Sequence, residues 1–118
     1  MDIRETTAPE SAAPKLEGEL RRGALVLAVL SQLREVQYSY SLRQALAQRG
    51  MPIEEGTLYP LLRRLEAQGV LASEWRIEDG PPRRYYRLND AGEALLAELT
   101  GTWNALVHTM AGLIGSGK

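Results

Sequence analysis

The segment from residue 54 to residue 88 limits the possible folds more than any other part of the chain. Its first half, EEGTLYPLLRRLEAQG, places leucines at the spacing of one buried helix face: Leu58, Leu61, Leu62 and Leu65. Residues 71–77 then alternate apolar and polar side chains, residues 79–82 (DGPP) have the composition of a turn, and residues 83–88 (RRYYRL) form a second alternating run. The pattern predicts a helix followed by a two-stranded hairpin with arginines beside its turn.

Pro60 restricts where this helix can begin. If Thr57 is the N-cap, the proline falls in the first turn, where its missing N–H has no helical partner to lose. If the helix begins at Glu54, the proline removes one helical hydrogen bond and should bend the helix. The sequence leaves both starting points open, and in either case Gly69 ends the helix.

Three further helices are expected around this unit. The first covers about residues 16–33, which include a run that is apolar all round. The second follows Ser39 as its N-cap and ends at Arg49-Gly50. The last follows Asn89, a good capping residue, and has acidic side chains in its first turn, where the helix dipole favours them.

This order of elements predicts a mainly α fold with a small β-hairpin wing. Residues 1–15, with two prolines and few large apolar groups, indicate a mobile tail. Residues 16–89 have the element order of a winged helix-turn-helix, and residues 90–115 form a long C-terminal helix. In such a fold the helix before the wing supplies contacts in a DNA groove, and the wing supplies contacts to phosphates.

The C-terminal helix carries an a/d heptad seam of apolar residues: Leu96, Leu99, Trp103, Leu106, Met110 and Leu113. This seam is longer than one helix needs to dock on a small domain, so it predicts a homodimer whose interface is formed by this helix. Intramolecular packing against the first helix is the alternative. Gly101 and Gly112 each cost about 1 kcal/mol relative to alanine in a helix interior, so the helix needs packing partners to persist.

Composition excludes several classes of protein. The chain has no cysteine and one histidine, His108, which rules out a disulfide framework and argues against a zinc site. No nucleophile–base–orienter set is visible, so we expect neither an enzyme nor a cofactor. The longest apolar run, residues 24–30, is far shorter than the ~20 residues that span a bilayer, and no secretory signal is visible. A cytoplasmic protein without membrane contacts is the expectation.

Charge supports nucleic-acid binding only weakly. The formal net charge is −1, but residues 38–88 hold eight arginines and six acidic residues, a local net of +2. Residues 1–19 hold two basic and five acidic residues, a local net of −3. The local field matters more than the sum, although many neutral domains would show a similar asymmetry.

Three motifs together resemble the PadR family of bacterial transcriptional regulators: Tyr38 and Tyr40 before the second helix, EGTLYP at residues 55–60, and PRRYYRL at residues 82–88. The resemblance covers roughly residues 20–103. It implies a dimer of winged helices joined by C-terminal helices, which usually represses nearby genes and is released by a ligand.

The chain departs from the family pattern at three places. Ser39 and Ser41 stand where family members often have glycine and glutamate, and Asn89-Asp90 stands where they usually have a Thr-Glu pair. These changes keep capping residues at the starts of two helices. Asp79 replaces one of the two glycines usual before the wing prolines, so it places a negative charge near the expected DNA surface.

The residues expected to contact DNA are Tyr38, Tyr40, Arg43, Thr57, Tyr59, Arg63, Arg64, Arg83 and Arg84. Packing is the alternative for Tyr38 and Tyr40. The wing pair, Arg83 and Arg84, is expected to bind phosphates, with a solvated hairpin tip as the alternative. Tyr59 and Arg63 share a helix face because they are four residues apart. Tyr59 could instead pack against the wing, and Arg63 could pair with Glu66 or Glu55. Tyr86 shares a strand face with Leu88 and is expected in the core.

Trp103 and Leu99 are the residues expected to bind an effector. Tryptophan is large for a two-helix seam and tends to hold the helices apart, and the resemblance implies that small aromatic or hydrophobic compounds bind in such a gap. A plain interface aromatic is the alternative for Trp103. The leading function is therefore a homodimeric repressor that binds an inverted-repeat operator and is released by a small hydrophobic ligand. A winged-helix interaction module that has lost DNA binding is the alternative.

Overall fold

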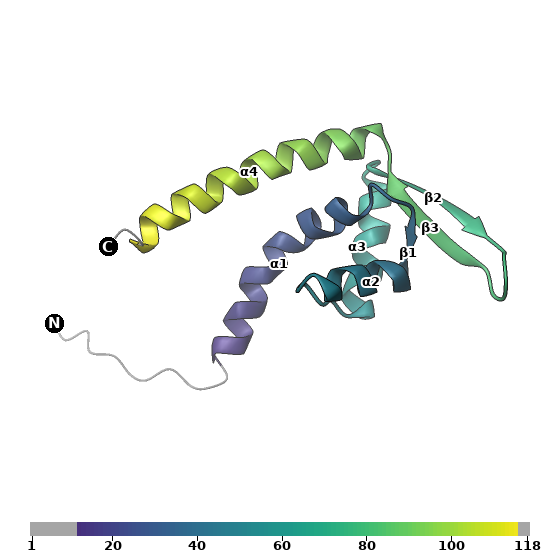
Figure 1. Ribbon diagram of the computed structural model, residues 1–118, viewed down its shortest axis with the longest axis horizontal. Helices are drawn as coiled ribbons and strands as arrows, with labels where there is room; N and C mark the ends of the chain where they lie inside the picture. Colours follow the sequence, from purple (N-terminus) through teal and green to yellow (C-terminus); the bar gives the residue numbers. More distant parts are fainter. Residues whose placement is uncertain (1–11, 116–118) are drawn as a thin grey trace.

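The computed structural model describes residues 12–115, which form four helices and one antiparallel sheet. The elements are α1 (Ala12–Gln32), β1 (Gln37–Tyr38), α2 (Ser39–Gln48), α3 (Glu55–Ala67), β2 (Leu71–Arg76), β3 (Arg83–Leu88) and α4 (Asp90–Ile114). Figure 1 shows the β2–β3 wing pointing away from α2 and α3, while α4 runs back on the side of α1. This arrangement confirms the predicted winged helix-turn-helix with a long C-terminal helix.

The sheet has three strands in the order β1-β3-β2. The β2–β3 hairpin pairs from Leu71↔Leu88 to Arg76↔Arg83, as the two alternating runs predict. The third strand was not predicted. It pairs only Gln37 and Tyr38 with β3, and a strand of two residues is too short to show an alternating pattern.

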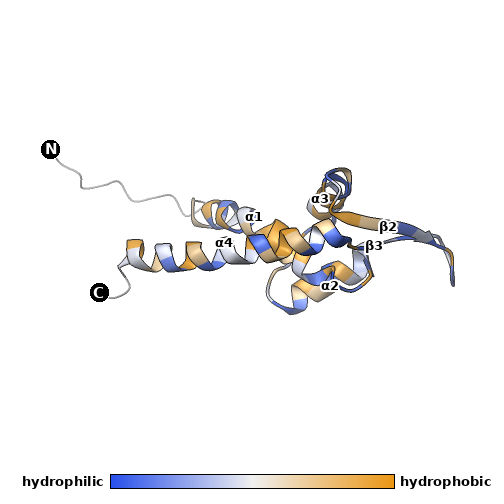
Figure 2. Ribbon diagram, turned by 90° about the horizontal axis from the view of Figure 1, so that it is seen from above, coloured by the Kyte–Doolittle hydropathy of each residue, from blue (hydrophilic) through white to orange (hydrophobic). Residues whose placement is uncertain are grey.

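The hydrophobic core lies where the three N-terminal helices meet the sheet and the first turns of α4. It consists of Val29, Leu30, Leu33, Leu42, Leu46, Leu58, Leu61, Leu62, Leu65, Leu71, Tyr86, Leu88 and Leu96. The leucine stripe predicted for α3 is therefore confirmed, as is the burial of Tyr86. In Figure 2 hydrophobic and hydrophilic residues alternate along α4, including the half that extends beyond this core.

The start of α3 settles the position of Pro60. Glu54 is the N-cap, and its carbonyl accepts the amides of Thr57 at 3.0 Å and Leu58 at 2.9 Å. Pro60 therefore lies inside the helix and not in its first turn, and the carbonyl of Gly56 has no amide four residues on to accept from. Thr57 is a helical residue, so the alternative that makes it the N-cap is wrong.

The prediction that Ser39 caps α2 was also wrong. Tyr38 is the N-cap, because it is held in an extended conformation by its pairing with Tyr85 in β3. The capping hydroxyl belongs to Ser41, which accepts the Tyr38 amide at 3.2 Å and donates to the Tyr38 carbonyl at 3.0 Å. Asn89 caps α4 as predicted, since its side-chain oxygen accepts the Gly92 amide at 2.8 Å.

The N-terminal boundary differs from the prediction as well. Helix α1 begins at Ala12, so residues 12–15 are helical and do not belong to a tail. The rest of the predicted tail, residues 1–11, lies outside the described residues. No helix within residues 12–115 is long and apolar enough to cross a membrane.

Candidate nucleic-acid interface

One exposed face of α3 carries Tyr59 and Arg63. The Arg63 guanidinium donates to the Tyr59 hydroxyl at 3.3 Å and lies 5.8 Å from the centre of its ring. The spacing of four residues therefore brings the two side chains together as predicted. Within residues 12–115 Arg63 does not form the alternative ion pair with Glu66 or Glu55, because each of these carboxylates pairs with a different arginine.

Glu66, one turn further along the same face, binds both strands of the wing. Its carboxylate accepts the Ser73 hydroxyl of β2 at 2.5 Å and the Arg84 guanidinium of β3 at 2.8 and 3.1 Å. The hydrogen bond from Ser73 lowers the pKa of Glu66, partial burial opposes this, and the hydrogen bond and positive charge of Arg84 lower it further. These contacts fix the wing relative to α3.

Removing the Glu66 charge is expected to weaken the fold in a pH-dependent way. Because the folded-state pKa of Glu66 is lowered, its stabilisation is present above the unfolded-state pKa and is lost as pH falls through the folded-state pKa. Glu66→Gln should lower the free energy of unfolding by about 1–2 kcal/mol at neutral pH. This range is that of a charge-assisted hydrogen-bond network whose side chains are mostly shielded from water. In acid the variant and the parent should converge.

The measurement is urea unfolding of both proteins at several pH values. Glu98→Gln is the matched control, because it removes the same charge from an exposed position on α4. If the Glu66→Gln variant is less stable than the parent by the same free energy of unfolding at neutral and at acidic pH, Glu66 has no ionic role.

The two wing arginines occupy opposite faces of β3. Arg84 faces α3, where it pairs with Glu66 and lies 5.5 Å from the Trp75 ring. Arg83 is exposed on the other face, where its guanidinium stacks over Tyr38 at 4.6 Å. Both residues were predicted to bind phosphates, although the alternation along β3 places Arg84 on the same face as the buried Tyr86 and so distinguishes it from Arg83.

The outer face of the sheet carries alternating rings and guanidinium groups. Tyr38 packs against Tyr85 with ring centres 5.3 Å apart, and Arg76 stacks over Tyr85 at 4.4 Å. Arg76 also pairs with Glu74 at 2.6 Å. Tyr38 is therefore a packing residue between α2 and the wing, and its ring supports Arg83.

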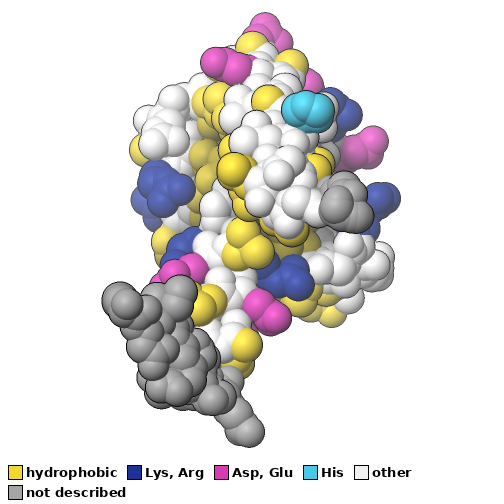
Figure 3. All heavy atoms as spheres, turned by 90° about the vertical axis from the view of Figure 1, so that its left-hand side faces the viewer, with side chains coloured by type: hydrophobic (Ala, Val, Ile, Leu, Met, Phe, Trp, Pro, Cys, Tyr) yellow, Lys and Arg dark blue, Asp and Glu magenta, His cyan; other side chains and the backbone are white. Residues whose placement is uncertain are grey.

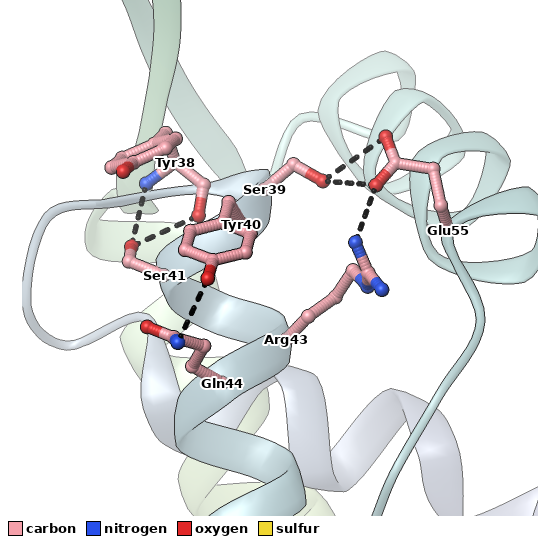
Figure 4. Close-up of polar contacts among 7 residues, drawn as sticks. All are labelled: Tyr38, Ser39, Tyr40, Ser41, Arg43, Gln44 and Glu55. Atoms are coloured by element: carbon pink, nitrogen blue, oxygen red, sulfur yellow. Dashed lines mark hydrogen bonds and ion pairs between the residues drawn. The ribbon is translucent and has the colours of Figure 1, made fainter.

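Figure 4 shows how the start of α2 is tied to the start of α3. The Glu55 carboxylate accepts the Ser39 hydroxyl at 3.3 and 3.4 Å and the Arg43 guanidinium at 3.1 Å. Tyr40 is exposed, and its hydroxyl accepts the Gln44 amide at 3.0 Å. The ion pair of Glu55 with Arg43 was not predicted, because nothing in the order of residues along the chain shows that Arg43 lies closer to Glu55 than Arg63 does.

The heptad seam of α4 divides into two parts. Leu96 is buried in the core of its own chain, and Leu99 is half-buried and packs against that core. Beyond them Trp103, Leu106 and Met110 are exposed by 44%, 50% and 45%, and Leu113 by 74%. Intramolecular packing therefore accounts only for the first two positions of the seam.

A groove separates this part of α4 from α1. Its lining includes Gly23, Ala24 and Leu27 from α1 and Leu99, Trp103 and Leu106 from α4. Figure 3, which faces the free ends of these helices, shows hydrophobic side chains gathered on this end of the molecule. Trp103 and Leu99, the two residues expected to bind an effector, thus line one apolar groove. No cluster of three metal-ligating side chains is found within residues 12–115.

Comparison with known proteins identifies similar chains. The model of the transcriptional regulator PadR-like family matches residues 26–98. The transcriptional regulator Rv3488 of Mycobacterium tuberculosis is 43% identical over 81 residues, which are 68% of this chain and 76% of that protein. A PadR family transcriptional regulator from Eggerthella lenta has a crystal structure with a TM-score of 0.85 and 48% identity, covering 90% of this chain and 95% of its own. A PadR-like transcriptional regulator from Bacillus cereus superposes with a TM-score of 0.73 at 28% identity, covering 82% of this chain and 97% of its own.

Proposed function

We propose, from the premise that this chain belongs to the PadR-like family of transcriptional regulators, that it is a homodimeric repressor binding an inverted-repeat operator. The membership implies DNA binding and a regulatory, non-enzymatic role, as the sequence predicts. The observation that carries the proposal is the exposed Tyr59–Arg63 face of α3 beside a wing held in place by Glu66.

In this proposal α3 lies in the major groove, with Tyr59 and Arg63 reaching base edges or the phosphates that border them. Arg83 on the exposed wing face binds a backbone phosphate. Arg84 acts differently: its ion pair with Glu66 holds the wing at the right angle to α3. The flanking candidates are Tyr40, which is exposed, and Arg43, which is held by Glu55 at the start of α2.

The dimer is proposed to form through the exposed part of the α4 seam. Isolated exposed apolar residues are ordinary, but a contiguous stripe marks an interaction surface. Trp103, Leu106, Met110 and Leu113 recur at heptad spacing, which suits a second copy of the same helix. The two-fold symmetry of such a dimer requires an operator with two inverted half-sites.

Ligand release is proposed to act through the groove between α1 and α4. A small aromatic or hydrophobic compound would lie against Trp103 and Leu99, between apolar walls. A ligand that binds one arrangement of the two α4 helices better than another would change the separation of the two α3 helices. Release needs only this difference in affinity between the arrangements.

An electrophoretic mobility shift of the protein on the DNA upstream of its own gene, with scrambled competitor and a salt series, tests the function. Specific and salt-sensitive retention supports an operator-binding regulator. If the intact dimer fails to bind any duplex at low salt, the winged-helix interaction module becomes the better description.

Arg83→Gln is expected to weaken binding to operator and scrambled DNA by a similar factor. A lost phosphate contact carries no sequence information, and it lowers the slope of log affinity against log salt by about 0.9. Arg34→Gln is the control: Arg34 lies in the turn after α1, and its partner within residues 12–115 is Glu93, in an exposed ion pair at 3.9 Å. If Arg83→Gln leaves the slope at the parental value, the exposed face of the wing does not contact phosphate.

A further inference from the structure

We propose that a hollow between α1 and the first turns of α3 is a second phosphate-binding subsite, so that the DNA footprint extends onto α1. This inference rests on the proposed DNA-binding function and adds to it a contact outside the helix-turn-helix and wing. The new residue is Arg22 of α1, which acts with Arg64 and Thr57 of α3. Its ligand is a phosphodiester group of the operator backbone.

The hollow has an apolar floor and a basic rim. The half-buried Leu25 and Val26 of α1 and the buried Leu61 of α3 form its floor, and the exposed Arg22, Thr57, Pro60 and Arg64 surround it. A hydroxyl donor and two guanidinium groups therefore border one depression, supplied by two helices that are far apart in the sequence.

Arg22 and Arg64 are among the described arginines without a carboxylate partner, whereas four other arginines are neutralised by a glutamate. Arg34, Arg43, Arg76 and Arg84 each lie within 4.0 Å of a glutamate oxygen. Across residues 12–115 neither Arg22 nor Arg64 forms such a pair, and no acidic residue lines the hollow. Two like charges beside an apolar wall repel one another, and the wall strengthens their field, so an anion placed between them would be bound.

The position of the hollow identifies which anion it receives. The face of α3 that carries Tyr59 and Arg63 adjoins the wing, whereas Thr57, Pro60 and Arg64 adjoin α1. Helix α3 is thus flanked by basic groups on both sides. A helix lying in a major groove about 12 Å wide has a phosphate backbone on each side, and backbone contacts fix its register. The wing would meet one backbone and Arg22 with Arg64 would meet the other.

The shape of the molecule agrees with this assignment. In Figure 1 the wing and the N-terminal half of α1 extend to opposite sides of α2 and α3. In the proposed dimer the partner lies on the α4 side, so α1 would approach the DNA between the wing and the dimer axis. Arg22 would therefore contact a phosphate toward the centre of the operator, and Arg83 one at its outer flank.

The test is a salt series on the full chain carrying Arg22→Gln, Arg64→Gln or both, with Arg34→Gln, in the turn that follows α1, as a control of equal charge. Arg22→Gln should lower the slope of log affinity against log salt by about 0.9 and should weaken binding to operator and to scrambled DNA by a similar factor. Arg34→Gln should leave the slope and the affinity unchanged. Because all three arginines are exposed, thermal unfolding followed by circular dichroism should show the same midpoint for each variant.

A neutral methylphosphonate, scanned one position at a time along the operator backbone, supplies the second readout. At one phosphate in each half-site, toward the operator centre, the methylphosphonate should weaken DNA binding by the parent protein. The same replacement should not weaken DNA binding by the Arg22→Gln variant. If the parent binds operator and Arg22→Gln matches it in affinity, slope and methylphosphonate profile, the proposal is wrong and the DNA-binding function stands. If the parent itself shows no salt-dependent DNA binding, the proposed function fails, and this subsite fails with it.

Discussion

Gly92→Ala is expected to destabilise the protein by about 3 kcal/mol, whereas Gly101→Ala in the same helix is expected to stabilise it by about 1 kcal/mol. A β-carbon added at Gly92 would lie far inside van der Waals contact with the carbonyl oxygen of Val70, and 3.0 Å from a methyl group of Leu88. A β-carbon added at Gly101 would have no such heavy atom within 4 Å.

The overlap at Gly92 cannot be relieved by moving a side chain, because the nearest atom is the backbone oxygen of Val70. The Val70 carbonyl accepts the Asn89 amide at 3.3 Å, and the Asn89 side chain donates to the Gly69 carbonyl at 2.9 Å. Asn89 also caps α4 by accepting the Gly92 amide. The first turn of α4 is therefore held against the α3–β2 turn, and an added methyl group must separate them.

Urea unfolding of the two alanine variants beside the parent measures the contrast. The opposite signs are informative because both substitutions are chemically identical and both lie in α4. Equal changes in the free energy of unfolding would mean that α4 is not docked through Gly92. A stable Gly92→Ala protein with altered DNA affinity would instead mean that α4 can shift without loss of packing.

The sequence predicts this part of the fold well where one local pattern decides the outcome. The leucine stripe of α3 and the Asn89 cap each depend on residues close together in the chain, so spacing and side-chain chemistry are sufficient. The winged architecture follows from the order of such elements. Even the burial of Tyr86 follows from alternation along a single strand.

The errors arise where a distant segment competes for the same residue. Ser39 is a good capping residue in isolation, but pairing of Tyr38 with β3 places the cap one residue earlier, and Glu55 binds the Ser39 hydroxyl. Alternation along β3 separates the faces of Arg83 and Arg84, but the ion-pair partner of Arg84, Glu66, comes from α3 and cannot be read from the strand. Leu96 belongs to the heptad pattern, yet it lies in the core of its own chain.

The double substitution Leu106→Glu and Met110→Glu is expected to give a folded monomer that binds operator at least ~100-fold more weakly than the parent. Both side chains are about half exposed in the single chain, so the substitutions leave the monomer core intact. In the proposed dimer they would bury uncompensated charges in the seam, which a tight helix pair cannot tolerate. Leu99 is a poorer choice, because it packs on the core and its loss would also weaken the fold.

Sedimentation velocity should show dimers for the parent and monomers for the double variant. Affinity falls because a dimer binds its second half-site at a high effective concentration, whereas each monomer must bind independently. His108→Glu is the control for charge: it adds one glutamate two residues from either site, on the opposite face of α4. If the double variant still sediments as a dimer, the interface lies elsewhere. If it is monomeric yet binds operator normally, each winged helix recognises DNA alone and the requirement for an inverted repeat disappears.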